Sequence, residues 1–236
     1  LVVKLDPNGV LVWWNTLRGG FCLPYDIEMY NNTLFITGDF KGNLIYSNNG
    51  NSQQTISNYS RSIFVLNTTL AGGKNWVNTI GSENDISARS ISVDSNNDAF
   101  VTGYFTCALT EFHQTQTAAY RSVGFKDAYL WKVKNGGGFD YLKTFGSKLD
   151  DVGHGVSILQ GTVPVICGGS TEDLNIPAGA SLNYSSNSLN FFNLNGYSSN
   201  EPGHYYLNGD VSRNSFITTA VETQTPAYNY FFLQPN

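Results

Sequence analysis

The chain has 236 residues with a formal net charge of −5, and 14% of its residues are aromatic but only 13% are charged. The shortage of lysine and arginine argues against a nucleic-acid partner, which needs clustered basic side chains to replace phosphate counterions. No run of about 20 apolar residues is present, so the sequence predicts no membrane span.

Asparagine takes the place that charged residues usually fill, with 27 Asn against 13 Lys plus Arg. Asn, Gly and Ser tolerate the backbone angles of tight turns, and no segment sustains the 3.6-residue apolar period of a helix. The composition therefore predicts an all-β chain of many short strands. The chain opens on the strand-like run 1–5 without an initiator Met or signal peptide, so we expect a mature or excised portion of a longer protein.

An internal repeat follows along the chain. Its clearest element is a strand with a central glycine, found at 35–40, 100–105 and 165–170. The three glycines are spaced 65 residues apart both times: Gly38, Gly103 and Gly168. A degenerate fourth copy at 216–220 places Thr219 at the glycine position. Such self-similarity at a fixed period is typical of repeat architectures.

Two further elements recur in a fixed order before each glycine strand. The first is an apolar strand that runs into a turn: 2–9, 64–69 and 130–136. The second is a strand that begins with an aromatic residue and is followed by glycine: 13–17, 76–80 and 141–145. With an alternating third strand such as 90–94, each repeat unit predicts four antiparallel strands.

Four antiparallel strands per repeat, with an aromatic residue and a glycine at fixed places, suit the blade of a β-propeller. We predict one repeat domain over 1–236. Its units are approximately 1–60, 61–126, 127–187 and 188–227, followed by a terminal strand, 228–236. The alternatives are a stacked β-solenoid or a multi-sheet sandwich. Since the chain starts and stops on the same strand type, either further blades are missing from it or its terminal strands pair with another copy.

The elements resemble the SBBP-type β-propeller repeat family. The resemblance rests on Lys4–Gly9 (Lys-Leu-Asp-Pro-Asn-Gly) and on Ile91–Asn97 followed by Val101–Gly103. It covers about residues 1–177 and weakens beyond them. It implies a propeller architecture in a surface or secreted setting, and the family offers no catalytic residues.

Three polar insertions separate the fourth strand of one unit from the first strand of the next. They cover Ser47–Arg61, Thr106–Lys126 and Gly179–Asn187 and are rich in Ser, Asn, Thr and Gln. We expect them to form exposed loops on one side of the array.

The sharpest local hypothesis is N-linked glycosylation at four Asn-x-Ser/Thr sequons, although chance alone would give this number in so Asn-rich a chain. We place two sequons at hairpin turns and two in the insertions, and expect all four to be accessible. The acceptors are Asn31, Asn58, Asn67 and Asn183.

Other candidate sites have simpler explanations. Asp94–Asp98 offers oxygens at alternating positions but lacks the glycine and bidentate Glu of a calcium loop, so hairpin-turn chemistry explains it better. The pair Asp150-Asp151 near His154 is interpreted as a polar connection between blades. The histidines lack zinc-ligand spacing. Trp13 and Trp76 recur in register, which favours a packing role over sugar stacking. We predict no catalytic residue, no metal site and no cofactor.

Cys22, Cys107 and Cys167 allow either one disulfide with a leftover thiol or three free thiols. The composition favours an extracellular or cell-surface location. The sequence therefore predicts a non-catalytic structural or adhesive β-propeller glycoprotein module, such as a subunit of a surface fibre. Its partners would be N-linked glycans and proteins, including further copies bound through edge strands. A carbohydrate-binding propeller is the alternative, and a glycoside-acting hydrolase is a weaker one.

Overall fold

A computed structural model describes residues 1–48, 51–56, 61–111 and 120–170, and beyond them the short strands at 174–175, 204–205, 214–219 and 230–231. Side chains are described within 1–48, 61–109 and 120–170. These described parts are all-β and contain no helix, which confirms the all-β part of the predicted fold. Accordingly, no helix in them is long and apolar enough to cross a membrane.

The strands in chain order are β1 (Val2–Leu5), β2 (Leu11–Arg18), β3 (Phe21–Tyr30), β4 (Thr33–Lys41), β5 (Asn43–Asn48), β6 (Asn51–Ile56), β7 (Arg61–Thr69), β8 (Lys74–Ser82), β9 (Ile86–Val93), β10 (Ala99–Phe105), β11 (Ala108–Glu111), β12 (Tyr120–Arg121), β13 (Asp127–Val133), β14 (Phe139–Phe145), β15 (Asp151–Leu159), β16 (Val163–Ser170), β17 (Leu174–Asn175), β18 (His204–Tyr205), β19 (Asn214–Thr219) and β20 (Tyr230–Phe231).

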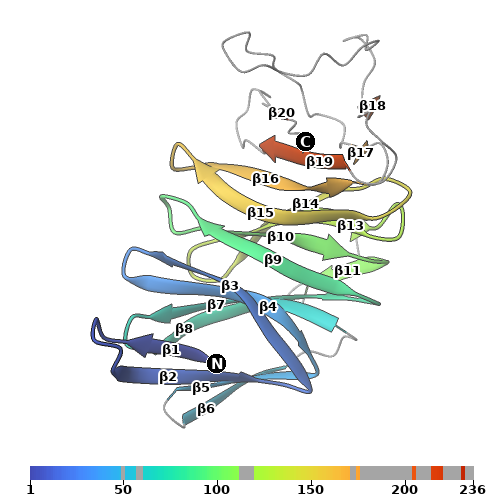
Figure 1. Ribbon diagram of the computed structural model, residues 1–236. Coiled ribbons are helices and arrows are strands. Elements are labelled where there is room, and N and C mark those ends of the chain that lie inside the picture. The colour runs from blue at the N-terminus through green and yellow to red at the C-terminus, as the bar shows by residue number, and fades with distance from the viewer. Residues whose placement is uncertain are drawn as a thin grey trace.

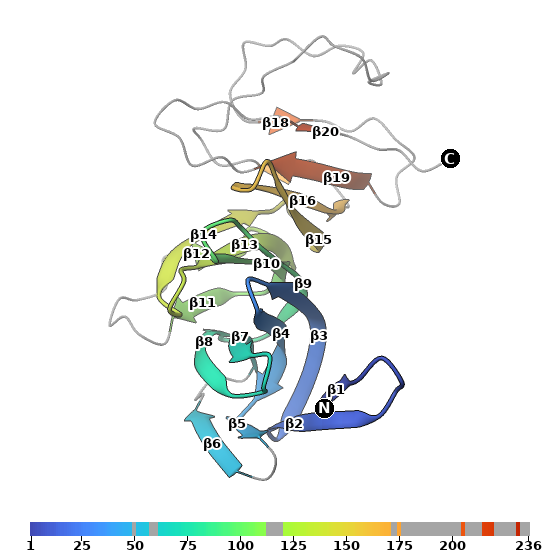
Figure 2. The ribbon, with the colours of Figure 1, turned by 90° about the vertical axis from the view of Figure 1, so that its left-hand side faces the viewer.

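Antiparallel pairing groups these strands into four sheets that lie one above another (Figures 1 and 2). The first sheet has the order β1-β2-β5-β6, and the second β3-β4-β7-β8-β11-β12. The third is β9-β10-β13-β14 and the fourth β15-β16-β19-β20, while β17 and β18 form a separate pair. The first strand of the third and fourth sheets packs across the preceding sheet: β9 lies across β3, β4 and β7, and β15 lies across β9, β10 and β13.

Each complete sheet combines strands from two consecutive sequence units. In the third sheet, β9 and β10 are the third and fourth strands of one unit, whereas β13 and β14 are the first and second strands of the next. A repeating order of four strands is cyclic, so the sequence does not show at which strand a sheet begins. The pairing of β10 with β13 settles that point.

The sequence predicts that 216–220 is a fourth copy of the glycine strand. Strand β19, which covers most of this segment, occupies a different position in its sheet. Its residue Phe216 pairs with Gly168 of β16, just as Phe64 pairs with Gly38 and Tyr129 pairs with Gly103. The segment 216–220 is therefore not a fourth glycine strand. It is the apolar strand that follows a glycine strand, and β20 lies beside it as the next strand.

Three hydrophobic cores fill the spaces between successive sheets. The core between the first and second sheets contains Leu17 and Phe40, and the core between the second and third contains Phe35 and Trp131. A smaller core between the third and fourth sheets includes Phe100. Strands such as β7 and β13 are buried on both faces, which explains their near-continuous apolar sequences.

The repeated glycines occupy equivalent positions, each opposite a β-bulge on the preceding strand. The bulges fall after Pro24, Ala88 and Gly153. At a bulge the neighbouring backbone comes unusually close. A Cβ added to Gly38 would lie 2.2 Å from the Leu23 carbonyl oxygen, and one added to Gly103 would lie 1.9 Å from that of Ser87.

The repeated aromatic strands hold successive sheets together. Trp13 of β2 lies against Gly72 in the β7–β8 turn, and Trp76 of β8 lies against Gly137 in the β13–β14 turn. These turn glycines have φ of 82° and 86°, which L side chains rarely adopt. Two residues after each tryptophan, an asparagine donates its amide N–H to the same glycine carbonyl, as Asn78 does to Gly137 at 2.7 Å. The predicted packing role of these tryptophans is confirmed.

The expectation that the first two insertions are loops is wrong. The first contributes part of β5 and all of β6, and the second contains β11 and β12. Strand β5 pairs with the outer edge of β2, and β11 pairs with the outer edge of β8. An unpaired edge offers backbone hydrogen-bonding groups to any extended segment nearby, so polar sequences can form strands there. The third insertion lies outside the described residues.

Candidate functional site

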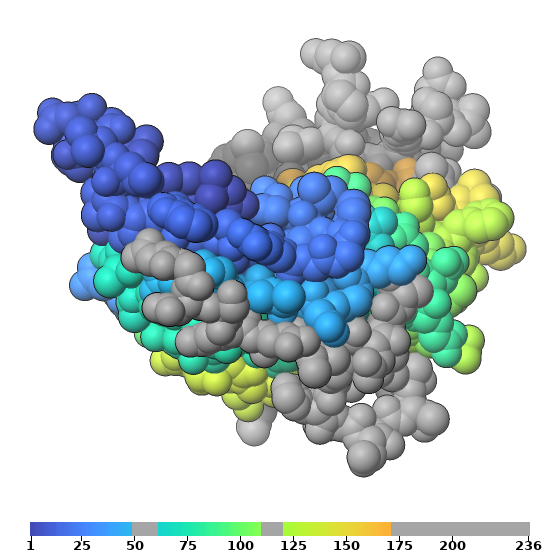
Figure 3. Space-filling view, turned by 90° about the horizontal axis from the view of Figure 1, so that it is seen from below, coloured from blue at the N-terminus to red at the C-terminus, as the bar shows by residue number. Residues whose placement is uncertain are grey.

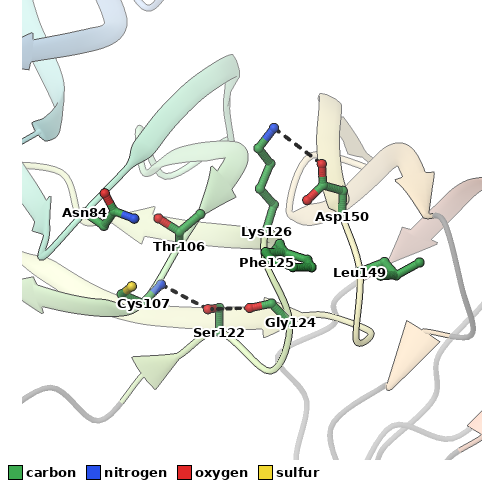
Figure 4. Close-up of a pocket in the computed structure, with 9 residues that line it drawn as sticks. All are labelled: Asn84, Thr106, Cys107, Ser122, Gly124, Phe125, Lys126, Leu149 and Asp150. Atoms are coloured by element: carbon green, nitrogen blue, oxygen red, sulfur yellow. Dashed lines mark hydrogen bonds and ion pairs between the residues drawn. The ribbon is translucent and has the colours of Figure 1, made fainter.

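A pocket of about 640 Å³ opens where four connections between strands meet (Figure 4). The contributing segments precede β9, follow β10, precede β13 and precede β15. The residues that line it are Asn84, Thr106, Cys107, Ser122, Gly124, Phe125, Lys126, Leu149 and Asp150.

Hydrogen bonds and one ion pair fix the walls of this pocket. Lys126 Nζ lies 3.5 Å from an Asp150 carboxylate oxygen and 4.9 Å from the centre of the Tyr104 ring. On another wall, the Cys107 amide donates to Ser122 Oγ at 3.0 Å. The Lys126 and Asp150 side chains are 36% and 47% exposed, so water screens their attraction and the pair contributes little to stability.

The lining presents charged, polar and aromatic groups to the pocket. The lysine and the carboxylate neutralise each other, and the exposed aromatic ring of Phe125 lies between the polar groups. Within the described residues, no three His, Cys, Asp or Glu side chains are placed to share a metal ion.

A partly buried ion network lies beside the pocket and joins the second and third sheets. Arg61 Nη2 lies 2.8 Å from Asp39 and its Nη1 lies 2.9 Å from Asp85. Asp39 is fully buried and also accepts the backbone N–H of Ala88 on β9 at 2.8 Å. The Tyr104 hydroxyl donates to Asp85 at 3.1 Å. One arginine therefore pairs with two carboxylates where the sheets meet.

Burial controls the protonation of this network. Loss of hydration raises the pKa of Asp39, and the Ala88 amide and the charge of Arg61 offset that effect only in part. For Arg61, burial lowers the pKa, but the charges of Asp39 and Asp85 outweigh it and the net pKa is raised. Because an arginine stays charged at all ordinary pH values, the acidic partner is the group that titrates.

Of the two predicted glycosylation sites within the described residues, Asn31 is the better placed. It is exposed in the β3–β4 turn with φ of 43°, and its side-chain amide donates to Asn97 at 3.1 Å. This is the hairpin position that the sequence predicts, and the exposed side chain is open to modification.

The expectation that all four acceptors are accessible is wrong for Asn67. This residue lies within β7, is only 4% exposed, and donates to the Leu34 carbonyl while it accepts from Asn75. The consecutive polar residues Asn67, Thr68 and Thr69 at the end of a strand look like a turn in the sequence. Pairing with both neighbouring strands instead places Asn67 in the interior of the sheet. Asn58 and Asn183 lie outside the described residues.

Hydrogen bonds within the hairpin occupy the carboxylate that resembles a calcium ligand. Asp94 Oδ1 accepts the backbone N–H groups of Asn96 and Asp98 at 2.8 and 2.9 Å. The turn between β1 and β2 shows the same bonding pattern, since Asp6 accepts from Asn8 and Val10. The turn-chemistry interpretation is confirmed.

The acidic residues before β15 act in the connection between sheets. Asp150 pairs with Lys126, and the buried Asp151 accepts the backbone N–H of Ser147. His154 lies exposed at the bulge of β15. The prediction of a polar connection between sheets agrees with these contacts.

The three cysteines lie apart and form no disulfide. Cys22, Cys107 and Cys167 are all free, which answers the question that the sequence left open. Cys22 is partly buried, and burial raises its pKa to about 11. Cys107 and Cys167 are exposed.

No protein-family model matches the chain, and no curated protein sequence matches it. The resemblance to SBBP-type repeats therefore stays a prediction. Sequence reasoning also missed the pocket, since residues such as Phe125 and Lys126 belong to an insertion that repeats nowhere else. Its only signal was the position of the insertions between units.

Proposed function

We propose that the chain is a non-catalytic β-propeller module of an extracellular structural or adhesive glycoprotein. One observation carries the proposal: three successive glycine–bulge hairpins, β3–β4, β9–β10 and β15–β16, stack by the same contacts. Each sheet covers the apolar face of the one before it, which is how propeller blades pack. Repetition of one packing contact builds a regular scaffold. The sequence differences between copies then fall mainly in the connections between strands.

The extracellular part of the proposal rests on composition and on the exposed sequon at Asn31. The protein from its natural source should occur in the extracellular or cell-surface fraction. Its intact mass should fall on enzymatic deglycosylation. In a recombinant form made by the same cells, Asn31→Gln should reduce that mass difference by one glycan, whereas the neighbouring Asn32→Gln should leave it unchanged because the sequon stays intact. An unmodified protein confined to the cell interior would contradict the proposal.

The pocket supports a second candidate function, carbohydrate binding. Phe125 is 70% exposed and lines the pocket together with Asn84 and Asp150; exposed aromatic rings in a pocket with polar groups are suited to stacking on sugars. A glycan array should then show binding that Phe125→Ala abolishes. The exposed Val123 lies outside the pocket lining, and Val123→Ala should leave binding unchanged. A blank array for the unaltered chain would remove this candidate.

A further inference from the structure

Strand β1 forms one edge of the first sheet, and no described strand pairs with the free side of this edge. In the other sheets the equivalent strand is paired on both sides: β7 with β4 and β8, β13 with β10 and β14, and β19 with β16 and β20. Strand β1 pairs only with β2. The first sheet therefore lacks the two inner strands that the other three possess.

The face of β3 toward the first sheet is uncovered as a consequence. Ile27 is 52% exposed and Met29 is 66% exposed. Their register partners on β4 identify Ile91 and Val93 as the equivalent residues of β9. Those two are only 3% and 4% exposed, because the second sheet covers them.

The fourth sheet repeats the comparison. Val156 of β15 occupies the position of Ile27 and is 9% exposed against the third sheet. Ile158, at the position of Met29, packs against the same core. Three copies of one interface thus exist in the chain, and two are covered by the inner strands of the preceding sheet. The third differs only in lacking those strands.

The open edge and the uncovered face adjoin. Figure 2 shows β1 and β3 on the same side of the stack, and Figure 3 shows the β1–β2 hairpin in dark blue projecting beyond the body of the molecule. We define the hairpin-binding surface as the free edge of β1 together with Pro24, Ile27 and Met29 of β3. Exposed edges and apolar faces are sites where another strand adds.

We propose that the hairpin-binding surface takes up a β-hairpin of this same repeat type, supplied by another polypeptide segment. Its second strand pairs with β1 as β10 pairs with β13, and its first strand covers Ile27 and Met29 as β3 covers part of β9. This inference rests on the proposed repeat architecture and goes beyond it by naming the surface and the partner.

The register defines what the partner hairpin must contain. Val2 pairs with Asn15 as Val65 pairs with Asn78, so Leu1 occupies the position of Phe64. Phe64 pairs with Gly38 in the complete sheet. The bound hairpin therefore needs a glycine opposite Leu1 and a bulge on its first strand, because the two features occur together in every copy.

The test uses the chain's own hairpin as the probe, a peptide of residues 85–106 that contains β9 and β10. Met29 is the only methionine in the chain. Because peroxide also oxidises the three free cysteines, the added oxygen on its thioether is located by fragmentation of the proteolytic peptide that contains Met29. Saturating peptide should slow oxidation of Met29 by peroxide about tenfold, since coverage hides the sulfur. Amide hydrogens of β1 should become protected in the same samples.

Matched variants separate docking from general effects. Ile27→Lys in the full chain should abolish the protection of Met29, since it places a charge in the interface. Val12→Lys should not, because Val12 is 54% exposed and lies on the side of β2 opposite the buried Trp13. A peptide with Gly103→Val should give no protection. If the free peptide does not fold alone, a second form of the probe is used. In it the same hairpin is fused before Leu1 through a linker as long as 106–126.

The outcomes are distinct. Protection of Met29 by the free or fused hairpin supports the inference, and protection that grows with the concentration of the chain alone identifies a second copy as the source. Unchanged oxidation with both forms of the probe overturns it. That result would leave the stacking of the sheets and the location and glycosylation of the protein untouched, so the proposed function is tested separately.

Discussion

Replacing Gly103 with alanine should lower the free energy of unfolding by about 3 kcal/mol, because the added carbon collides with backbone. The ideal Cβ position lies 1.9 Å from the Ser87 carbonyl oxygen and 3.0 Å from the Tyr129 hydroxyl. That hydroxyl donates to the same carbonyl at 3.1 Å and is fully buried. Neither group can retreat without breaking the bulge or the pairing of β9 with β10. Denaturant unfolding followed by tryptophan fluorescence measures the loss.

Gly138→Ala is the matched control for this substitution. No heavy atom lies within 4 Å of the position that its Cβ would take, and its φ is not in the left-handed region. Its unfolding free energy should stay within about 0.5 kcal/mol of the unaltered chain. Equal effects of the two substitutions would show that the glycine–bulge contact does not support the sheets.

The repeat could be predicted from the sequence because packing imposes it residue by residue. A glycine is needed at Gly38 and Gly103 because the bulge brings a carbonyl into the space of a side chain. Trp13 and Trp76 recur because each covers a turn of the next sheet. Contacts that repeat in space leave a period in the sequence, and the strand order follows from it.

Features set by edges could not be predicted in this way. Asn67 reads as a turn residue, and only its pairing with Phe35 and Trp76 on the flanking strands places it inside. The polar segment of β6 becomes a strand because β5 offers it a free edge. The pocket around Phe125 arises where four connections between strands meet, and most of its lining belongs to the insertion 106–126. These features depend on which strands and connections lie nearby in space. The local sequence of each segment does not specify those neighbours.

Replacing Arg61 with methionine should cost about 3–5 kcal/mol of unfolding free energy at neutral pH. The substitution keeps the apolar length of the side chain but leaves Asp39 fully buried without its cation. Burial already raises the pKa of Asp39, and loss of the guanidinium raises it further. Lys134→Met is the control, because Lys134 is 57% exposed and its partner Asp140 keeps the ion pair with Lys132; it should cost less than about 1 kcal/mol.

The pH dependence of the Arg61→Met variant distinguishes an unpaired charge from simple loss of packing. An acid whose pKa is higher in the folded than in the unfolded state contributes stability at low pH, and that contribution is lost as pH rises through the folded-state pKa. The stability difference between Arg61→Met and the unaltered chain should therefore shrink between about pH 7 and about pH 4.5, as Asp39 takes up a proton. Adding Asp39→Asn to the variant should recover part of the loss at pH 7, because the neutral amide needs no cation. A difference that stays constant with pH, with no recovery in the double variant, would mean that Arg61 stabilises the contact between sheets through its hydrocarbon chain alone.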